Sequence, residues 1–135
     1  MSDPVFLKSD PWIFARDSDE TIRHLIDVLG FQHWFDPDEE MRVGGVRGPR
    51  GFFVRIRENP AYLDAIADLA LAARPVTRIS VQNIDELHAL HVANGARIVV
   101  EIGDRPWGDR EYTVEEINGQ LLTFSEEDIE RVRAR

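Results

Sequence analysis

The sequence has no cysteine, an excess of acidic over basic residues and no long apolar run. Without cysteine, disulfides, thiolate nucleophiles and cysteine-based metal sites are excluded. Its 16 lysines and arginines against 25 aspartates and glutamates give a net charge of −9, which argues against nucleic acid or an anionic membrane as partner. The longest apolar run, residues 69–73, is far shorter than the ~20 residues that span a bilayer. We therefore expect a cytoplasmic protein that binds neither nucleic acid nor membrane.

The rest of the composition is that of one folded domain. Hydrophobic residues make up 43% of the 135-residue chain and charged residues 30%, a balance typical of globular proteins and not of disordered segments. A chain of this length buries a sizeable core without crosslinks. We expect a single domain over residues 1–135, and its function has to be inferred from the pattern of residues.

Two helices are predicted to begin with the same capping chemistry. Asp17 precedes a run with helical apolar spacing and is followed three residues later by Glu20, which is the pattern of a capping box. Asn83 and Glu86 repeat this pattern in the second half of the chain. Each helix follows one strand-like segment and precedes three more, and this repeated order indicates an internal duplication.

The duplication predicts an α+β fold built from two βαβββ modules. Module one covers about residues 11–57 and module two about residues 76–126. A helix over about residues 60–74 links them, with Asn59 as its cap and Pro60 at its first position. The strands are expected at residues 12–15, 31–35, 41–46, 52–57, 76–81, 97–102, 110–115 and 120–125.

On this pattern, several short motifs resemble the vicinal oxygen chelate superfamily of glyoxalases, bleomycin-resistance proteins and extradiol dioxygenases. The motifs are Phe14-Ala15-Arg16-Asp17, the helix end at 27–31, Pro106-Trp107-Gly108, Arg110-Glu111-Tyr112, Asn118-Gly119 and Leu122-Thr123-Phe124. The later motifs are similar in order to those of the bleomycin-resistance branch. The resemblance covers about residues 11–126. It implies curved mixed sheets around a cleft, helices outside, a small-molecule ligand inside and, as in many members, a homodimer.

The resemblance also implies where a metal would lie in the enzymes of this superfamily. There, His, Gln or Glu residues on the first and last strands of each module hold a divalent cation that acts as a Lewis acid. The matching positions here are Asp10, Phe53 or Arg55, Val76 and Thr123. Only Asp10 offers a suitable hard ligand, and an arginine would repel a cation. We therefore expect no metal and no cofactor, and whether the protein is an enzyme stays open.

Strand alternation suggests which residues line the cleft, because side chains two apart share one face of a sheet. The expected ligand-binding residues are Trp12, Phe14, Phe53, Arg55, Arg78 and Thr123. The aromatic rings can stack on a planar ligand, and Arg55 or Arg78 can pair with a carboxylate or phosphate. In the strand at 52–57 the pattern leaves open whether Arg55 and Arg57 face the cleft or point to water.

Two other groups of residues are expected to have no direct role in the site. Glu111, Glu115 and Glu116 are interpreted as a solvated acidic face. His88 and His91 are three residues apart on a helix, a spacing that can bind zinc, but no certain third ligand lies nearby. We interpret them as the flank of an amphipathic helix.

The leading functional hypothesis is a metal-independent protein that resembles the bleomycin-resistance branch and sequesters a drug or metabolite in its cleft. The alternative is a divergent metal-dependent glyoxalase-like lyase or dioxygenase, which would hold its metal through Asp10, a histidine and an acidic side chain. A third hypothesis is a regulatory or structural dimer whose cleft is filled by Trp12, Phe14 and Phe53. A ligand of unknown identity is expected in the first two cases.

Overall fold

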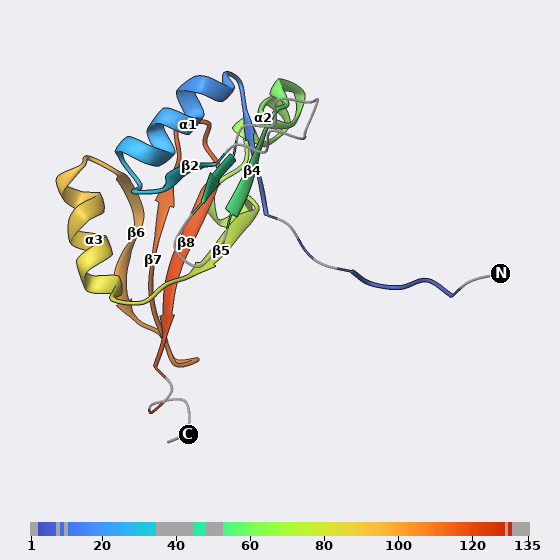
Figure 1. Ribbon diagram of the computed structural model, residues 1–135. Coiled ribbons are helices and arrows are strands. Elements are labelled where there is room, and N and C mark those ends of the chain that lie inside the picture. The colour runs from blue at the N-terminus through green and yellow to red at the C-terminus, as the bar shows by residue number, and fades with distance from the viewer. Residues whose placement is uncertain are drawn as a thin grey trace.

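The computed structural model describes residues 3–7, 9, 11–34, 45–47, 53–128 and 130, without the side chains of 33, 34, 45–47 and 53. Most of the strand predicted at 41–46 and the candidate metal ligand Asp10 lie outside the described residues. The chain forms two four-stranded sheets with helices packed on them, and the N-terminal segment runs away from this body (Figure 1).

The first sheet comes from the N-terminal half of the chain. Its elements are β1 (Trp12–Ala15), α1 (Ser18–Asp27), β2 (Gln32–Trp34), β3 (Gly45–Arg47) and β4 (Phe53–Glu58). The strand order is β1-β4-β3-β2. β1 is parallel to β4, and the other neighbours are antiparallel. The parallel pair requires a crossover between its strands, which begins with α1.

The second half repeats this arrangement after a short helical connection. Its elements are α2 (Pro60–Ala67), the 3₁₀ turn η2 (Leu71–Ala73), β5 (Val76–Ser80), α3 (Ile84–Ala93), β6 (Arg97–Asp104), β7 (Asp109–Glu115) and β8 (Leu121–Glu127). The strand order β5-β8-β7-β6 matches that of the first sheet, with one parallel pair and two antiparallel pairs. The predicted α+β class is confirmed. No helix in the described part of the chain is long and apolar enough to cross a membrane.

Two of the three predicted helix caps are confirmed and the third is wrong. The side chain of Asp17 accepts the N–H of Glu20, and that of Asn59 accepts the N–H of Tyr62. Asn83, in contrast, has a left-handed backbone and makes no capping hydrogen bond with its side chain. Glu126 on β8 accepts the N–H groups at this helix start instead, at 2.9 and 3.1 Å. A tertiary contact therefore replaces the local capping box.

The helix predicted over residues 60–74 is interrupted. α2 ends at Ala67, and η2 follows as a separate turn. The carbonyl of Leu69, which a continuous helix would pair with the N–H of Ala73, accepts the Nε of Arg74 at 3.0 Å. Arg74 also donates to the carbonyl of Gly119 and to Glu115, so this side chain draws the end of the predicted helix toward the β7–β8 hairpin.

One face of each sheet is buried beneath a helix. In the first sheet Ile13, Val54 and Ile56 are at most 1% exposed and belong to one core that includes Leu25 of α1. This answers the question of which β4 residues face the core. Val54 and Ile56 do, and Arg55 lies on the opposite face of the sheet. In the second sheet the core residues are Ile79, Tyr112, Val114, Leu122 and Phe124.

His91 is a core residue and not a helix flank. It is fully buried, and its Nε2 lies 2.9 Å from the carbonyl of Leu29 while its Nδ1 lies 2.7 Å from the hydroxyl of Tyr112. A carbonyl only accepts, so Nε2 carries the proton and Nδ1 accepts from the tyrosine. Burial lowers the pKa of His91, and the nearby His88 lowers it further. Neither ring nitrogen of His91 is available to a metal.

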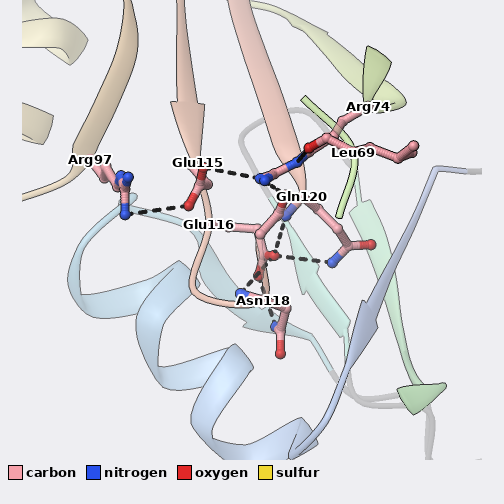
Figure 2. A network of polar contacts seen from close by, with 8 residues as sticks. Leu69, Arg74, Arg97, Glu115, Glu116, Asn118 and Gln120 are labelled. Atoms are coloured by element: carbon pink, nitrogen blue, oxygen red, sulfur yellow. Dashed lines mark hydrogen bonds and ion pairs between the residues drawn. The ribbon is translucent and has the colours of Figure 1, made fainter. Parts of the chain in front are cut away.

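The two sheets meet where the β7–β8 hairpin reaches β1 (Figure 2). The side chain of Gln120 accepts the N–H of Phe14 at 3.0 Å and donates to its carbonyl at 2.7 Å, as a neighbouring strand would. Asn118 accepts the N–H of Arg16. These contacts satisfy backbone groups on the edge of β1 that does not pair with β4. We call Glu116, Asn118 and Gln120 the hairpin clamp.

Glu116 organises the hairpin clamp from a buried position. Its carboxylate, 1% exposed, accepts the N–H groups of Asn118 and Gln120 and both of their side-chain amides. Burial raises the pKa of Glu116, although these hydrogen bonds act in the opposite direction. The prediction of a solvated acidic face is therefore wrong for Glu116, and also for Glu111, which is 9% exposed. Local sequence cannot show that a hairpin meets another strand.

Replacing Gln120 with alanine should lower the free energy of unfolding by about 1–3 kcal/mol, because the N–H and carbonyl of Phe14 and one acceptor site on the Glu116 carboxylate lose their partner. Urea unfolding followed by circular dichroism measures the change. The matched control is Gln32→Ala, at an exposed glutamine on β2, which should stay within about 0.5 kcal/mol of wild type. Equal losses in both variants would contradict the clamp.

The burial of His91 should make stability depend on pH. Its pKa is lower in the folded than in the unfolded chain, so the stabilisation is complete above the ordinary value of 6.5 and is lost as the pH falls through the folded-state value. His91→Gln should therefore be less stable than wild type at pH 7.5 but lose less stability between pH 7.5 and 5.5. Urea titrations at a series of pH values test this, and parallel profiles for the two proteins would refute it.

Candidate functional site

The six residues predicted to bind a ligand divide between the two sheets. Trp12 and Arg55 are opposite each other in the β1–β4 register, and the Arg55 guanidinium carbon lies 5.7 Å from the centre of the Trp12 ring. This cation–π contact joins two half-buried side chains on the face of the first sheet away from α1. The structure therefore gives Arg55 an aromatic neighbour within its own sheet.

Phe14 and Phe53 are placed less simply. The ring of Phe14 lies 4.5 Å from that of Tyr62, so α2 covers this aromatic residue. Phe53 pairs with Arg47 in the β3–β4 register, and its side chain is outside the described residues. The described part of the chain thus shows Trp12 with Arg55 and Phe14 with Tyr62, but no cavity that contains both aromatic residues.

Arg78 and Thr123 are brought together on the second sheet. They are opposite each other in the β5–β8 register, and Thr123 is opposite Thr113 in the β7–β8 register. The two threonine hydroxyls, both nearly buried, are 2.7 Å apart and hydrogen-bond to each other. This row crosses the face of the sheet away from α3, as strand alternation predicts for Arg78 and Thr123.

Two carboxylates that the sequence analysis did not select hold Arg78. Its Nη2 lies 2.6 Å from Asp109 Oδ2 and also contacts Glu111 Oε2. Partial burial lowers the pKa of Arg78, but the hydrogen bonds and charges of Asp109 and Glu111 outweigh this and raise it. In a strand over residues 109–113, Asp109 and Glu111 lie on the same face as Thr113, whereas Arg110 and Tyr112 lie on the other face. This alternation in the sequence could have identified the two carboxylates.

A pocket opens beside this ion pair. It has a volume of about 460 Å³, within the roughly 300–1,000 Å³ of small-molecule sites. Its lining residues are Arg78, Ser80, Val81, Gln82, Asp109, Ser125, Glu126 and Glu127. Of the six predicted residues, only Arg78 is among them. The pocket is polar, unlike the aromatic cleft that we expected.

The charges around the pocket do not balance. Three carboxylates line it against one arginine, and that arginine is already paired with Asp109 and Glu111. A guanidinium makes a two-point contact with a carboxylate either through Nε and Nη2 or through Nη1 and Nη2. Both modes use Nη2, and in Arg78 this nitrogen is already occupied. The geometry therefore disfavours the bidentate capture of an anion that we expected from Arg78.

The positions that would hold a metal in the enzymes that the sequence motifs resemble do not offer a matching set of ligands. Asp10 is outside the described residues, Val76 has no donor, and Arg55 is cationic. The Thr123 hydroxyl is engaged with Thr113. The described residues also contain no group of three or more histidine, aspartate or glutamate side chains arranged to hold an ion. The donor set therefore does not match a divalent metal.

The fold is that of the glyoxalase/bleomycin resistance protein/dioxygenase superfamily. No family model matches the sequence, and none of the curated proteins matches it significantly. Solved structures do match. TioX from Micromonospora sp. ML1 is 22% identical with a TM-score of 0.67, over 91% of this chain and 98% of that one.

Two further solved structures agree with this assignment of the fold. A superfamily member from Alicyclobacillus acidocaldarius is 16% identical with a TM-score of 0.71, over 92% of this chain and 93% of that one. A bleomycin-binding protein from Streptomyces verticillus, solved with copper(II)-bleomycin, is 23% identical with a TM-score of 0.65, over 93% of this chain and 100% of that one. At these identities the likeness concerns the fold, which the sequence motifs predicted correctly.

The Thr113–Thr123 pair should behave as one unit. Thr113→Val or Thr123→Val alone leaves one buried hydroxyl without its partner, and we expect either to cost about 1–2 kcal/mol of unfolding free energy. The double variant removes both hydroxyls and should cost clearly less than the sum. A urea double-mutant cycle measures this coupling, and strictly additive losses would show that the hydroxyl pair contributes nothing.

Proposed function

We propose that this protein binds a polar small molecule in the pocket beside Arg78, on the face of its second sheet away from α3, and sequesters it without a metal. The chain acts as one domain in which two βαβββ modules, residues 11–57 and 76–126, are joined by α2 and pack around a shared cleft. It works in the cytoplasm as a homodimer. No reaction is assigned to it.

The pocket beside Arg78 is the observation that carries this proposal. It is large enough for a small ligand. Its hydroxyl and carboxylate groups come from β5, β7 and β8, and the amide of Gln82 comes from the connection between β5 and α3. Ser80 and Ser125 are neighbours in the β5–β8 register and form part of its wall. A rigid sheet is a suitable base for a binding site because its side chains are fixed by the register.

The charge of the pocket indicates the kind of ligand. Asp109 is paired with Arg78, and Glu126 accepts the N–H groups at the start of α3. With Glu127, these carboxylates still leave the pocket net negative, which favours a ligand with a positive charge or several hydrogen-bond donors. Either Nε or Nη1 of Arg78 can still donate a single hydrogen bond to a ligand oxygen. The net charge of −9 also favours approach of a cation. Because Asp109 and Glu111 neutralise Arg78, the overall charge and the pocket favour the same kind of ligand.

The bleomycin-binding protein of Streptomyces verticillus supports binding rather than catalysis, since it shares the fold and is described by what it binds. The alternative of a metal-dependent lyase or dioxygenase also has a structural neighbour, a glyoxalase-related enzyme from Clostridium phytofermentans, but the described residues do not offer a matching set of metal ligands. The pocket beside Arg78 gives a binding protein a place for its ligand, but it is not the cleft of Trp12, Phe14 and Phe53 to which the pocketless-dimer hypothesis refers.

Filling the pocket should abolish binding without unfolding the protein. A thermal-shift screen of cationic and zwitterionic small molecules should give hits that raise the melting temperature by several degrees. Ser80→Trp, at an exposed position in the pocket wall, should remove that shift by occupying the space.

The control is Ala93→Trp, which adds the same bulk at an exposed position on α3 and should keep the shift. Isothermal titration then gives the affinity of each hit for the three proteins. A hit that binds Ser80→Trp as tightly as wild type does not occupy this pocket. A screen without any hit would count against the proposed function.

A further inference from the structure

The connection between β5 and α3 forms part of the pocket wall. It consists of Val81, Gln82 and Asn83, of which the first two line the pocket. Two consecutive residues of β8 hold its ends. The carbonyl of Ser125 accepts the N–H of Val81 at 2.8 Å. The carboxylate of Glu126 accepts the N–H groups of Asn83 and of the first residue of α3, at 2.9 and 3.1 Å. The position of this part of the wall therefore depends on β8.

Asn83 has an uncommon backbone for the residue that precedes a helix. Its φ and ψ are 59° and 51°, and it is the only non-glycine residue with a positive φ in the part of the chain that the structure describes. The corresponding residues of α1 and α2, Asp17 and Asn59, have φ values of −135° and −153° and cap their helices with their own side chains. A left-handed backbone is unfavourable for residues other than glycine, although asparagine tolerates it better than most. A contact from outside the connection therefore has to hold Asn83 in this conformation.

The sequence contains a second way to cap α3. Asn83 and Glu86 have the residue types of a capping box, in which the side chain of the first residue accepts the N–H of the second. That arrangement requires an extended backbone at the first residue. In the structure the side chain of Asn83 makes no capping hydrogen bond. The two ways of capping α3 exclude each other, because the backbone of Asn83 is left-handed in one and extended in the other.

We propose that Glu126 is a positioning residue of the pocket: its carboxylate holds Asn83 in the left-handed conformation and thereby fixes Val81 and Gln82 in the pocket wall. Without this carboxylate the start of α3 changes to its own capping box, and the connection that leads into the helix moves. Both carboxylate oxygens of Glu126 accept backbone N–H groups, so this side chain acts on a ligand through the wall. Only this effect on binding rests on the proposed function.

NMR spectroscopy of isotope-labelled protein tests the positioning without any ligand. In Glu126→Ala the backbone chemical shifts of Asn83 should change from left-handed to extended values, and those of the two wall residues should change with them. The two amides that Glu126 binds in wild type should exchange with solvent at least about tenfold faster. The control Glu86→Ala removes a carboxylate from the same helix end but leaves the Glu126 contact in place, so it should keep the wild-type values.

A matched pair of variants tests the same conformation at Asn83 itself. A β-branched valine disfavours the left-handed backbone, whereas glycine adopts it freely. Asn83→Val should therefore move the wall as Glu126→Ala does, although Asn83 is not one of the lining residues, and Asn83→Gly should keep the wild-type wall. This pair also decides the question if Glu126→Ala does not fold. The proposal is overturned if Asn83 stays left-handed in Glu126→Ala, or if Asn83→Val leaves the wall unchanged.

The effect on binding is measured separately with agmatine, a small molecule with one ammonium and one guanidinium group. Isothermal titration should give similar affinities for wild type and Asn83→Gly, and at least about tenfold weaker binding by Asn83→Val. These variants keep every charge of the pocket, so the loss comes from the moved wall. Equal affinities of Asn83→Val and wild type would overturn the role in binding. Absence of agmatine binding by wild type would count against the proposed function alone, and the NMR comparison would still decide the role of Glu126.

Discussion

The structure depends on the hydrogen bonds between the Gln120 side chain and the backbone of Phe14, which join the second sheet to the first strand of the first sheet. They place a side-chain amide where a fifth strand would otherwise lie. Glu116 fixes that amide by accepting from it and from the hairpin backbone. A buried carboxylate is costly on its own, and here four hydrogen bonds offset its desolvation.

Much of the fold can be predicted because its signals are local. Alternation within a strand identifies the buried face, as the nearly unexposed Val54 and Ile56 show for β4. Capping chemistry marks the starts of α1 and α2. The left-handed backbone at Gly30 and Gly95 follows from the glycines that end the two repeated helices. The repeated order of elements then indicates a known type of fold without any family model.

The features that could not be predicted depend on distant contacts. Asn83 has the residue type of a cap, yet Glu126 from another strand does the capping. Glu116 looks like one of several surface acids until the hairpin reaches β1. His91 has the spacing of a helix flank, but its ring bridges Leu29 and Tyr112. In each case the polar group is satisfied by a partner that its own sequence neighbourhood does not reveal.

The candidate site was predicted only in part for the same reason. Alternation assigned Arg78 and Thr123 to the open face of the second sheet, where they are register neighbours. It could not show that Asp109 and Glu111 neutralise the arginine, which changes the expected ligand from an anion to a cation. Nor could it show that Phe14 is covered by Tyr62. Periodicity identifies the face of a residue, but charge pairing across strands decides what that face can bind.

The separation of 106 residues between Phe14 and Gln120 has a consequence for synthesis on the ribosome. The first strand emerges early, whereas the amide that completes the outer edge of β1 is translated 106 residues later. Until then that edge carries unpaired backbone groups that another nascent chain can join. The first sheet is therefore completed only once the β7–β8 hairpin has been translated and folded.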